Sequence, residues 1–399
     1  MVRSDHKKIL VIAGEASGDL HGGRVIENLL RLDPQIRVYA VGGEALRQAG
    51  AQILVDSSEL AVVGITEVIG RMGKIIRRFF ELKGFIKKTG LSLLILIDFP
   101  DFNLAVANVA RKVGIPILYY ISPQVWAWRP GRVRKIARRI DKMAVILPFE
   151  VPIYERAGVS VEFVGHPLLD SIPCQGPENL PPINKERGTP QIVLLPGSRT
   201  HEVQSLLPEM LEACSILFKK YPKARFTIAA ASTIRIEDLE SMVRSSPVET
   251  RLVKGQTYRA IHEADLAIVA SGTATLETAL LGKPMVILYR VSPISYWVGR
   301  ALVNVQCIGL VNIVAGKRII PELLQDEACG KRIAEEALRI LEDEAYRQSM
   351  IRELQEVGRR LGSPGASERV ARLAVAMMRS PSAFPACHGS AAGWPKGAG

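Results

Sequence analysis

An unbroken apolar run at residues 93–97, Leu-Leu-Ile-Leu-Ile, ends directly on Asp98. A run of this length is typical of a strand that is buried on both faces, as in a parallel sheet covered by helices. Ligands of such sheets bind beyond the carboxyl ends of the strands. The position therefore predicts that Asp98 acts as a general base, with Asp101 and Asn103 holding its substrate or its geometry.

Asp101 and Asn103 also have a simpler interpretation, because either residue can cap a helix. The apolar spacing after residue 103 predicts that such a helix begins there. This interpretation fits Asp98 poorly. Pro100 disfavours the helical conformation at Phe99, and so keeps Asp98 at the end of the strand.

Apolar runs alternate with amphipathic stretches over most of the chain, and this rhythm predicts the fold class. Repeated strand–helix units imply parallel, doubly wound sheets. Six prolines between residues 167 and 190 interrupt the rhythm and indicate a linker between two such sheets. The strands are expected near residues 8–13, 38–41, 53–55, 93–97, 115–120, 142–147, 192–195, 226–230 and 266–269.

The chain has 399 residues, which is long enough for two domains with full cores. We expect an α/β protein of two doubly wound, Rossmann-like domains that face a cleft. The first domain is expected over residues 1–170 and the second over 190–345, followed by C-terminal helices over 346–380. The tail over 381–399 is rich in Pro, Ala, Gly and Ser and is expected to be disordered.

The composition excludes several classes of protein. With 48% hydrophobic and 23% charged residues, the chain is globular rather than disordered. No apolar run is long enough to span a bilayer, and residues 1–8 lack the apolar core of a signal peptide. The five cysteines and six histidines show no paired or ligand-type spacing. We therefore expect a reduced, cytoplasmic protein without a metal site.

The net charge of +12 predicts an anionic partner, and its distribution indicates which kind. Residues 65–80 predict a helix with one apolar stripe beside several basic residues. Such a helix either packs on the core with a solvated basic edge or lies on an anionic membrane surface. The stripe consists of Ile65, Val68, Ile69, Met72, Ile75, Ile76, Phe79 and Phe80.

A second basic cluster spans residues 129–142, directly after Trp126 and Trp128. Tryptophans beside arginines can stack on RNA bases. They can equally hold a sugar face or a phosphate, or anchor a loop to the core. Both basic stretches belong to the first half of the chain, so that half is expected to face the anionic partner.

Three glycine-containing turns follow predicted strands, and each can place backbone N–H groups near an anion. The first is Gly-Glu-Ala-Ser-Gly-Asp at residues 14–19. It is not the GxGxxG pattern and lacks the lysine of a P-loop, so a purely structural turn remains an alternative. The second, Leu-Leu-Pro-Gly-Ser-Arg at residues 194–199, ends on Arg199, which can bind phosphate bidentately. A surface arginine at a helix start is the alternative, although the helix dipole disfavours it there.

The third turn, Ala-Ser-Gly-Thr-Ala-Thr-Leu-Glu at residues 270–277, contains Ser271, Gly272 and Thr273. Its glycine lets a phosphate approach the helix that begins near Thr273. Glu277 lies one turn along this helix, where a carboxylate can bind a ribose diol. Helix capping by Ser271 or Thr273 is the alternative. Together, the second and third turns predict a nucleotide diphosphate held by the second domain.

Six motifs, in this order, resemble lipid A disaccharide synthase over about residues 8–325. They are Gly-Glu-Ala-Ser-Gly-Asp (14–19), Asp-Phe-Pro-Asp-Phe-Asn (98–103), Ser-Pro-Gln-Val-Trp-Ala-Trp (122–128), Gly-His-Pro (165–167), Leu-Pro-Gly-Ser-Arg (195–199) and Ala-Ser-Gly-Thr-Ala (270–274). The resemblance implies a glycosyltransferase B fold. It also implies a cytoplasmic enzyme of Gram-negative lipopolysaccharide synthesis that associates peripherally with the inner membrane. The implied reaction joins UDP-2,3-diacylglucosamine to 2,3-diacylglucosamine 1-phosphate, giving a β-1,6-linked disaccharide 1-phosphate and UDP.

The resemblance also implies roles for individual residues. Asp98 matches the family's proposed general base, Arg199 its arginine near the nucleotide, and Asn312 a polar residue across the cleft. The family usually has proline where this chain has Val311. The helix at 65–80 matches the family's membrane-facing segment. The first-domain turn, expected to bind substrate, contributes Glu15, Ser17, Gly18 and Asp19.

Inversion at the anomeric carbon needs a base for the incoming hydroxyl and stabilisation of the departing diphosphate. Asp98 is expected to take the proton of the acceptor 6-hydroxyl. Arg199 and the helix start at Thr273 are expected to stabilise the charge on UDP. No Asp-x-Asp sequence lies near this site, so neither a metal ion nor another cofactor is expected.

Two other functions are open. A UDP-N-acetylglucosamine 2-epimerase shares the two-domain plan but has no use for an apolar and basic surface helix. An RNA-binding protein that uses Trp126 and Trp128 would leave Asp98 and the phosphate-type turns unexplained, so no nucleic acid partner is expected. The expected partners are UDP-diacylglucosamine, diacylglucosamine 1-phosphate and the inner membrane surface. The oligomeric state is not predicted.

Overall fold

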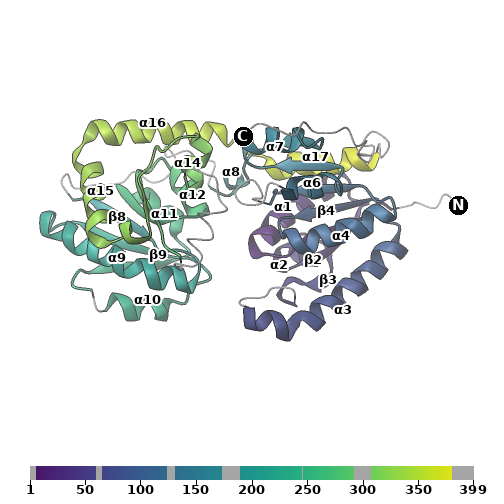
Figure 1. The fold of residues 1–399 in the computed structure, drawn as a ribbon, viewed down its shortest axis with the longest axis horizontal. Coiled ribbons are helices and arrows are strands. Elements are labelled where there is room, and N and C mark those ends of the chain that lie inside the picture. The colour runs from purple at the N-terminus through teal and green to yellow at the C-terminus, as the bar shows by residue number, and fades with distance from the viewer. Residues whose placement is uncertain are drawn as a thin grey trace. The chain divides into compact units, whose positions relative to one another are not determined.

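The computed structural model describes residues 6–59, 65–123, 131–172, 189–244, 246–291 and 307–379. The chain forms two compact units, one of Met1–Pro167 with Ser363–Gly399 and the other of Leu168–Gly362. We call them the first and the second unit. Each contains a parallel sheet with helices packed on it (Figure 1). The predicted α/β fold class is thereby confirmed. The tail over 381–399 lies outside the described residues.

The first unit contains a seven-stranded parallel sheet of order β3-β2-β1-β4-β5-β6-β7. Strand β1 pairs with both β2 and β4, so the strand order reverses between β1 and β4. Such a switch point is where open α/β sheets bind ligands. The strands are β1 (Lys8–Ala13), β2 (Arg37–Gly42), β3 (Gln52–Asp56), β4 (Leu93–Ile97), β5 (Ile117–Tyr120), β6 (Lys142–Val145) and β7 (Ser160–Phe163). The helices are α1 (Ala16–Leu32), α2 (Glu44–Gln48), α3 (Ile65–Thr89), α4 (Pro100–Lys112), α6 (Gly131–Ala137), α7 (Val151–Glu155) and α17 (Ala366–Arg379).

Strand β4 is buried on both faces, as its apolar run predicts. All five of its side chains are fully buried. Leu94 and Leu96 pack in a core with residues of α3, α4 and α6. Leu93, Ile95 and Ile97 pack in a second core with residues of α1 and α17. The sheet is therefore a layer between two apolar cores, and only its strand ends offer room for polar chemistry.

Helix α4 begins at Pro100, which is earlier than the start near residue 103 that the apolar spacing predicts. Proline suits the first position of a helix, because its missing N–H has no partner there and its φ is already helical. Because of this early start, only Phe99 separates Asp98 from the helix. Four further strands were not predicted. Three of them, Ser160–Phe163, Thr250–Lys254 and Glu322–Leu324, are edge strands without a continuous apolar run, whereas the interior strand Met285–Tyr289 has such a run and was missed.

The second unit repeats the same plan with a six-stranded parallel sheet of order β10-β9-β8-β11-β12-β13. Its switch point lies between β8 and β11. The strands are β8 (Gln191–Leu195), β9 (Arg225–Ala230), β10 (Thr250–Lys254), β11 (Leu266–Ala270), β12 (Met285–Tyr289) and β13 (Glu322–Leu324). The helices are α8 (Leu168–Ser171), α9 (Thr200–Lys220), α10 (Ile236–Val243), α11 (Thr257–Glu263), α12 (Thr273–Leu280), α14 (Leu310–Ala315), α15 (Gly330–Glu342) and α16 (Glu344–Arg360).

The last helix returns to the first unit. Residues 346–380 were expected to form C-terminal helices after the second domain; in the structure α16 belongs to the second unit and α17 to the first. Helix α17 packs against α1, and its apolar side chains complete one core of the first sheet. The buried apolar residues of α17 are Ala366, Val370, Ala371, Ala374, Val375, Met377 and Met378.

Candidate functional site

The ends of β1 and β4 bring two predicted site residues together. The last residues of these strands pair with each other, so Glu15 and Asp98 follow neighbouring strand ends. The ring of Phe99 packs on Gly14, where an added Cβ atom would lie 2.3 Å from ring carbons. Glycine is therefore required at this position for the ring to fit.

The backbone turns sharply after β4. Asp98 and Phe99 have φ angles of 45° and 47°. Residues with a Cβ atom avoid this left-handed region, at a cost on the order of 1 kcal/mol or more each. Here the carbonyl oxygen of Asp98 accepts hydrogen bonds from the Tyr119 hydroxyl at 2.6 Å and the Asn103 amide at 2.5 Å. These contacts hold the turn in place.

The Asp98 carboxyl group is half-buried, and its surroundings change its acidity. Burial first, and then the charge of Glu15, raise the pKa of Asp98 from 3.8 to about 6, although a hydrogen bond from the Phe99 N–H opposes them. A general base works best when its pKa lies near the operating pH. At neutral pH Asp98 is mostly ionised and is basic enough to accept a proton.

Asp101 and Asn103 both lie on α4 but have different surroundings. Asp101 is exposed and forms an ion pair with Arg132 of α6. Asn103 is fully buried, and its amide donates to the carbonyl groups of Asp98 and of the residue before it. The N-cap residue of α4 is Phe99, and no side chain caps the helix. Of the two predicted roles for Asn103, these contacts favour the holding of geometry.

The turn after β1 supplies both exposed and buried groups. Glu15 and Ser17 are exposed at the start of α1, and Gly18 is buried against the ends of β1 and β4. Asp19 is buried, and its carboxylate accepts hydrogen bonds from three N–H groups in residues 43–46, at 2.6–3.4 Å. Asp19 therefore caps α2. The predicted contact of Asp19 with substrate stays a prediction, and in this structure its oxygens bind the start of α2.

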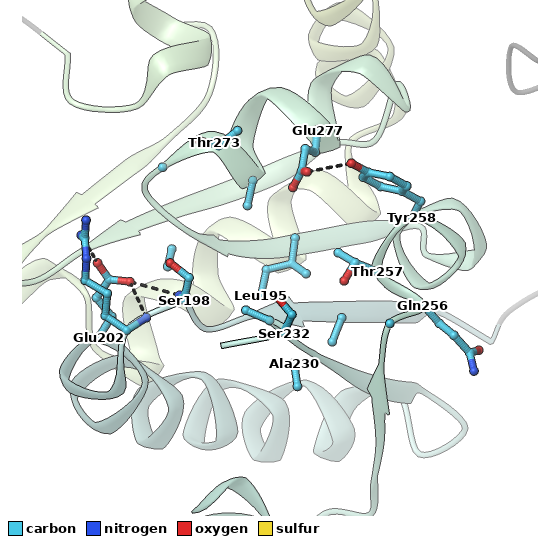
Figure 2. A pocket seen from close by; sticks show the side chains of 18 of the residues that line it. Leu195, Ser198, Glu202, Ala230, Ser232, Gln256, Thr257, Tyr258, Thr273 and Glu277 are labelled. Atoms are coloured by element: carbon cyan, nitrogen blue, oxygen red, sulfur yellow. Dashed lines mark hydrogen bonds and ion pairs between the residues drawn. The ribbon is translucent and has the colours of Figure 1, made fainter. Parts of the chain in front are cut away.

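A pocket of about 780 Å³ in the second unit collects most of the residues predicted there (Figure 2). It lies at the ends of β8, β9 and β11, next to the switch point of this sheet. The two turns that the sequence identifies as phosphate-binding thus line a single cavity. The predicted residues in its lining are Arg199, Ser271, Gly272, Thr273 and Glu277.

Glu202 fixes the turn between β8 and α9. Its Oε2 accepts hydrogen bonds from the backbone N–H groups of Ser198 at 3.2 Å and Arg199 at 3.3 Å (Figure 2). Its Oε1 accepts from the Arg199 guanidinium at 2.9 Å. Gly197 has a φ of 116°, and a Cβ atom there would lie 2.7 Å from the Glu202 carboxylate. The Arg199 side chain remains 71% exposed and keeps further N–H donors for an anion.

The start of α12 forms another part of the pocket. This helix begins directly after β11, so its first N–H groups favour an anion. No side chain caps α12, which excludes the capping interpretation of Ser271 and Thr273 in this structure. Glu277 lies one turn along and accepts a hydrogen bond from the Tyr258 hydroxyl at 3.0 Å (Figure 2). Burial raises the pKa of Glu277, and this hydrogen bond lowers it.

Some lining residues were not predicted from the sequence. Glu202 follows Arg199 by three residues, which is the spacing of a capping box, and this signal could have found it. Ser232 and Tyr258 carry no comparable signal. Ser232 lies in the loop after β9, and Tyr258 lies on α11, the helix that follows β10. Both reach the pocket through the strand order β10-β9-β8, which the sequence does not show.

Asn312 lies on α14 in the second unit, with its side chain inside that unit. It is fully buried, and its Nδ2 donates to the carbonyl of Ile320 at 2.9 Å and to Glu322 at 2.7 Å. Its Oδ1 accepts from the N–H groups of Ile319 at 2.9 Å and Ile320 at 3.0 Å. These bonds use both N–H groups and both lone pairs of the amide. Asn312 thus ties α14 to β13 in this structure, and its predicted contact with substrate stays a prediction.

The described apolar side chains of α3 have two different environments. Ile75 and Phe79 pack against the core, whereas Ile76 and Phe80 are 48% and 59% exposed. Phe79 contacts Phe102 of α4, whose ring in turn contacts that of Phe99. An aromatic chain thus connects α3 to the turn that carries Asp98. The side chains of Ile65, Val68, Ile69 and Met72 lie outside the described ones.

The second basic cluster is only partly described. Trp126 and Trp128 lie outside the described residues. Three of the described cations are engaged within the protein. Arg132 pairs with a carboxylate of α4, Lys142 pairs with a carboxylate of β7, and Arg139 donates to a carbonyl of α4. The two ion pairs offset part of the positive charge that the sequence places here.

The described residues contain neither a membrane-spanning helix nor a cluster of metal ligands. None of the helices there combines the length and the apolar character needed to cross a bilayer. In the same parts of the chain, no three His, Cys, Asp or Glu side chains gather in a way that could hold a metal ion.

Solved structures of an epimerase and of a glycosyltransferase have similar folds. The UDP-GlcNAc 2-epimerase from Neisseria meningitidis, bound to UDP-GlcNAc, matches with a TM-score of 0.60 and 14% identity, over 92% of this chain and 100% of that chain. The glycosyltransferase of kitacinnamycin matches with a TM-score of 0.62 and 15% identity, over 94% and 99%. At these identities the likeness shows the fold alone, and this fold is the glycosyltransferase B fold that the motifs imply.

Sequence relatives distinguish between the activities that share this fold. A model of the family described as lipid-A-disaccharide synthetase matches residues 9–372. The lipid-A-disaccharide synthase of Geobacter sulfurreducens is 47% identical over 380 residues, which cover 95% of this chain and 99% of that protein. These matches do not favour the epimerase or the RNA-binding alternative. The chain belongs to the lipid-A-disaccharide synthase family of glycosyltransferases.

Proposed function

We propose that this chain transfers a diacylglucosamine unit from UDP-2,3-diacylglucosamine to 2,3-diacylglucosamine 1-phosphate with inversion at the anomeric carbon. The products are the β-1,6-linked disaccharide 1-phosphate and UDP. The observation that carries the proposal is Asp98, a half-buried carboxylate at the switch point of the first sheet, with a pKa of about 6. The family match supplies the reaction, and this carboxylate supplies the base that the reaction needs.

In the proposed reaction the 6-hydroxyl oxygen of the acceptor forms a bond to C1 of the donor sugar. The bond from C1 to the UDP oxygen breaks, and the hydroxyl proton moves to Asp98. A base positioned in this way contributes typically 10²–10⁴-fold to the rate of such a step. Inversion follows because the acceptor attacks on the side opposite to the leaving diphosphate.

The pocket of the second unit is proposed to hold UDP. Arg199 and the start of α12 would stabilise the negative charge that develops on the departing diphosphate. Glu277 would accept hydrogen bonds from the ribose hydroxyls, with Tyr258 holding the carboxylate. The volume of about 780 Å³ is in the range of sites for small molecules and cofactors.

The protein is also proposed to work at the inner membrane surface, where both lipid substrates reside. Helix α3 supports this, because Ile76 and Phe80 are exposed. Lys74, Lys87 and Lys88 on the same helix are exposed as well. Apolar side chains beside cations are typical of helices that lie in the interface of an anionic membrane.

One experiment tests the central proposal. The protein is incubated with both lipid substrates, and disaccharide 1-phosphate and UDP are measured with and without the acceptor. We expect equal amounts of both products and no UDP release without the acceptor. Asp98→Ala should abolish turnover while UDP binding, measured by calorimetry, is unchanged. Full turnover in that variant would exclude Asp98 as the base, and acceptor-independent UDP release would indicate a hydrolase or an epimerase instead.

A further inference from the structure

The turn that carries Asp98 is unusual because two consecutive residues with side chains occupy the left-handed region. Asp98 has a φ of 45° and Phe99 a φ of 47°. A backbone of this kind persists only where its surroundings over-determine it, and such turns concentrate at functional sites. The contacts that hold this turn can therefore act on the reaction without touching a substrate.

The Tyr119 hydroxyl makes one of these contacts. Tyr119 lies on β5 and is fully buried, and its hydroxyl donates to the carbonyl oxygen of Asp98 at 2.6 Å. Burial raises the pKa of Tyr119 well above its usual value of 10.0, so the hydroxyl keeps its proton and remains a donor. The N–H of Asp98 continues the ladder by donating to the Tyr120 carbonyl at 3.3 Å, so both backbone groups of Asp98 are bound to β5.

Asn103 makes the second contact from the other side. Its Nδ2 donates to the carbonyls of Ile97 at 3.2 Å and Asp98 at 2.5 Å. Its backbone N–H donates to the Phe99 carbonyl at 3.1 Å, which closes the first turn of α4. The Asp98 carbonyl is thus fixed by one side chain from β5 and one from α4. Fixing a carbonyl fixes the peptide plane that follows, and with it the direction in which the Asp98 side chain leaves the backbone.

We propose that Tyr119 and Asn103 are positioning residues that hold the Asp98 carboxylate in the orientation needed to accept the proton of the acceptor hydroxyl. The inference rests on the proposed function, because it assigns these residues to the same base. Neither residue touches a substrate, since both are fully buried. Their contribution is geometric, and reaction rates are sensitive to misplacement of a catalytic group by about 1 Å.

The alternative is that the Tyr119 hydroxyl only satisfies a buried carbonyl, as most buried hydroxyls do. In that case its loss would lower stability and would leave the kinetics of correctly folded protein unchanged. The neighbouring Tyr120 offers a matched control. It is equally buried on the same strand, but its side chain packs in the core on the opposite face of the sheet.

The test compares Tyr119→Phe with Tyr120→Phe in the full chain. For each we measure kcat, the KM values of both lipid substrates, the Kd of UDP and the melting temperature. We expect Tyr119→Phe to lower kcat at least tenfold, with both KM values and the Kd of UDP within twofold of the parent protein. Tyr120→Phe should keep kcat within twofold. Asn103→Ala provides a second variant with the same expected kinetic pattern, in case Tyr119→Phe does not fold.

The outcomes separate this inference from the proposed function. If Asp98→Ala is inactive but Tyr119→Phe and Asn103→Ala keep kcat within twofold, the positioning role is overturned and Asp98 remains the base. A loss confined to KM, or an equal loss of kcat in Tyr120→Phe, would also overturn it. If Asp98→Ala itself keeps full turnover, the assignment of the base fails and this inference fails with it.

Discussion

Asp98 links the electrostatics of a strand end to the chemistry proposed for it. Its pKa of about 6 has two raising causes, burial and the charge of Glu15 on the neighbouring turn. The carboxylate must be ionised before it can accept a proton from a hydroxyl. The protonation state of Asp98 should therefore determine how kcat/KM falls at low pH.

We expect kcat/KM to fall as the pH decreases through about 6, rather than near the ordinary value of 3.8. Glu15→Gln removes the second raising cause, so it should lower the pKa of Asp98 and move this fall to lower pH. The measurement is a pH–rate profile of disaccharide formation for both proteins. A fall that stays at the same pH in Glu15→Gln would show that Glu15 does not influence the base.

Single residues also show which parts of the candidate site can be predicted from a sequence. Asp98 was predictable because it ends an apolar run, and Arg199 because it follows a glycine turn. Asp19 and Asn312 belong to equally suggestive motifs, yet both are buried with their oxygens engaged. A motif gives the residue type and the spacing. It does not show whether a polar side chain turns toward a ligand or toward the backbone of its own fold.

At the scale of elements, α3 shows a similar limit. Its spacing of apolar residues predicts one stripe, but the structure uses two neighbouring faces. Ile75 and Phe79 pack on the core, and Ile76 and Phe80 are exposed. Periodicity could not separate these faces, because residues one apart on a helix differ by only about 100° in direction. The exposed pair is the part of α3 that is available to a membrane.

We expect the double variant Ile76→Ser with Phe80→Ser to weaken binding to anionic vesicles at least tenfold. Burying one such side chain contributes about 1.5–3 kcal/mol, and a tenfold change needs about 1.4 kcal/mol. Binding is measured by co-sedimentation with vesicles of phosphatidylglycerol and phosphatidylethanolamine. Phe218→Ser is the control, because Phe218 is 38% exposed on α9 of the second unit. Equal weakening in the control, or none in the double variant, would contradict the role of α3.

At the scale of the whole molecule, the sequence predicted two doubly wound sheets but did not assign α17. An amphipathic helix shows which of its faces is apolar, and it does not show which sheet that face will cover. Here the apolar face of α17 completes a core of the first sheet, so the chain returns to the unit in which it began. The first unit is therefore built from two separate stretches of the chain.

Arg369 connects these two stretches. Its Nε donates to the Val164 carbonyl at 2.8 Å, close to where the chain leaves the first unit. Its Nη1 and Nη2 donate to the carbonyls of Pro364 at 2.9 Å and Ser363 at 2.5 Å, where the chain returns. One guanidinium thus binds the chain both where it leaves the first unit and where it returns to it. Its planar set of N–H donors matches three carbonyl groups.

We expect Arg369→Met to destabilise the first unit by about 2–3 kcal/mol, because hydrogen bonds to a charged group contribute about 1.5–3 kcal/mol and three carbonyls lose their donor. Arg372→Met is the matched control, since Arg372 lies one turn later on α17 and pairs with the exposed Glu368. An exposed pair of this kind contributes little. Calorimetric melting should show a lower transition for Arg369→Met and almost none for Arg372→Met, while the Kd of UDP stays unchanged in both. Equal shifts in the two variants would mean that Arg369 acts as an ordinary surface cation, and that α17 is held to the first unit by its apolar face alone.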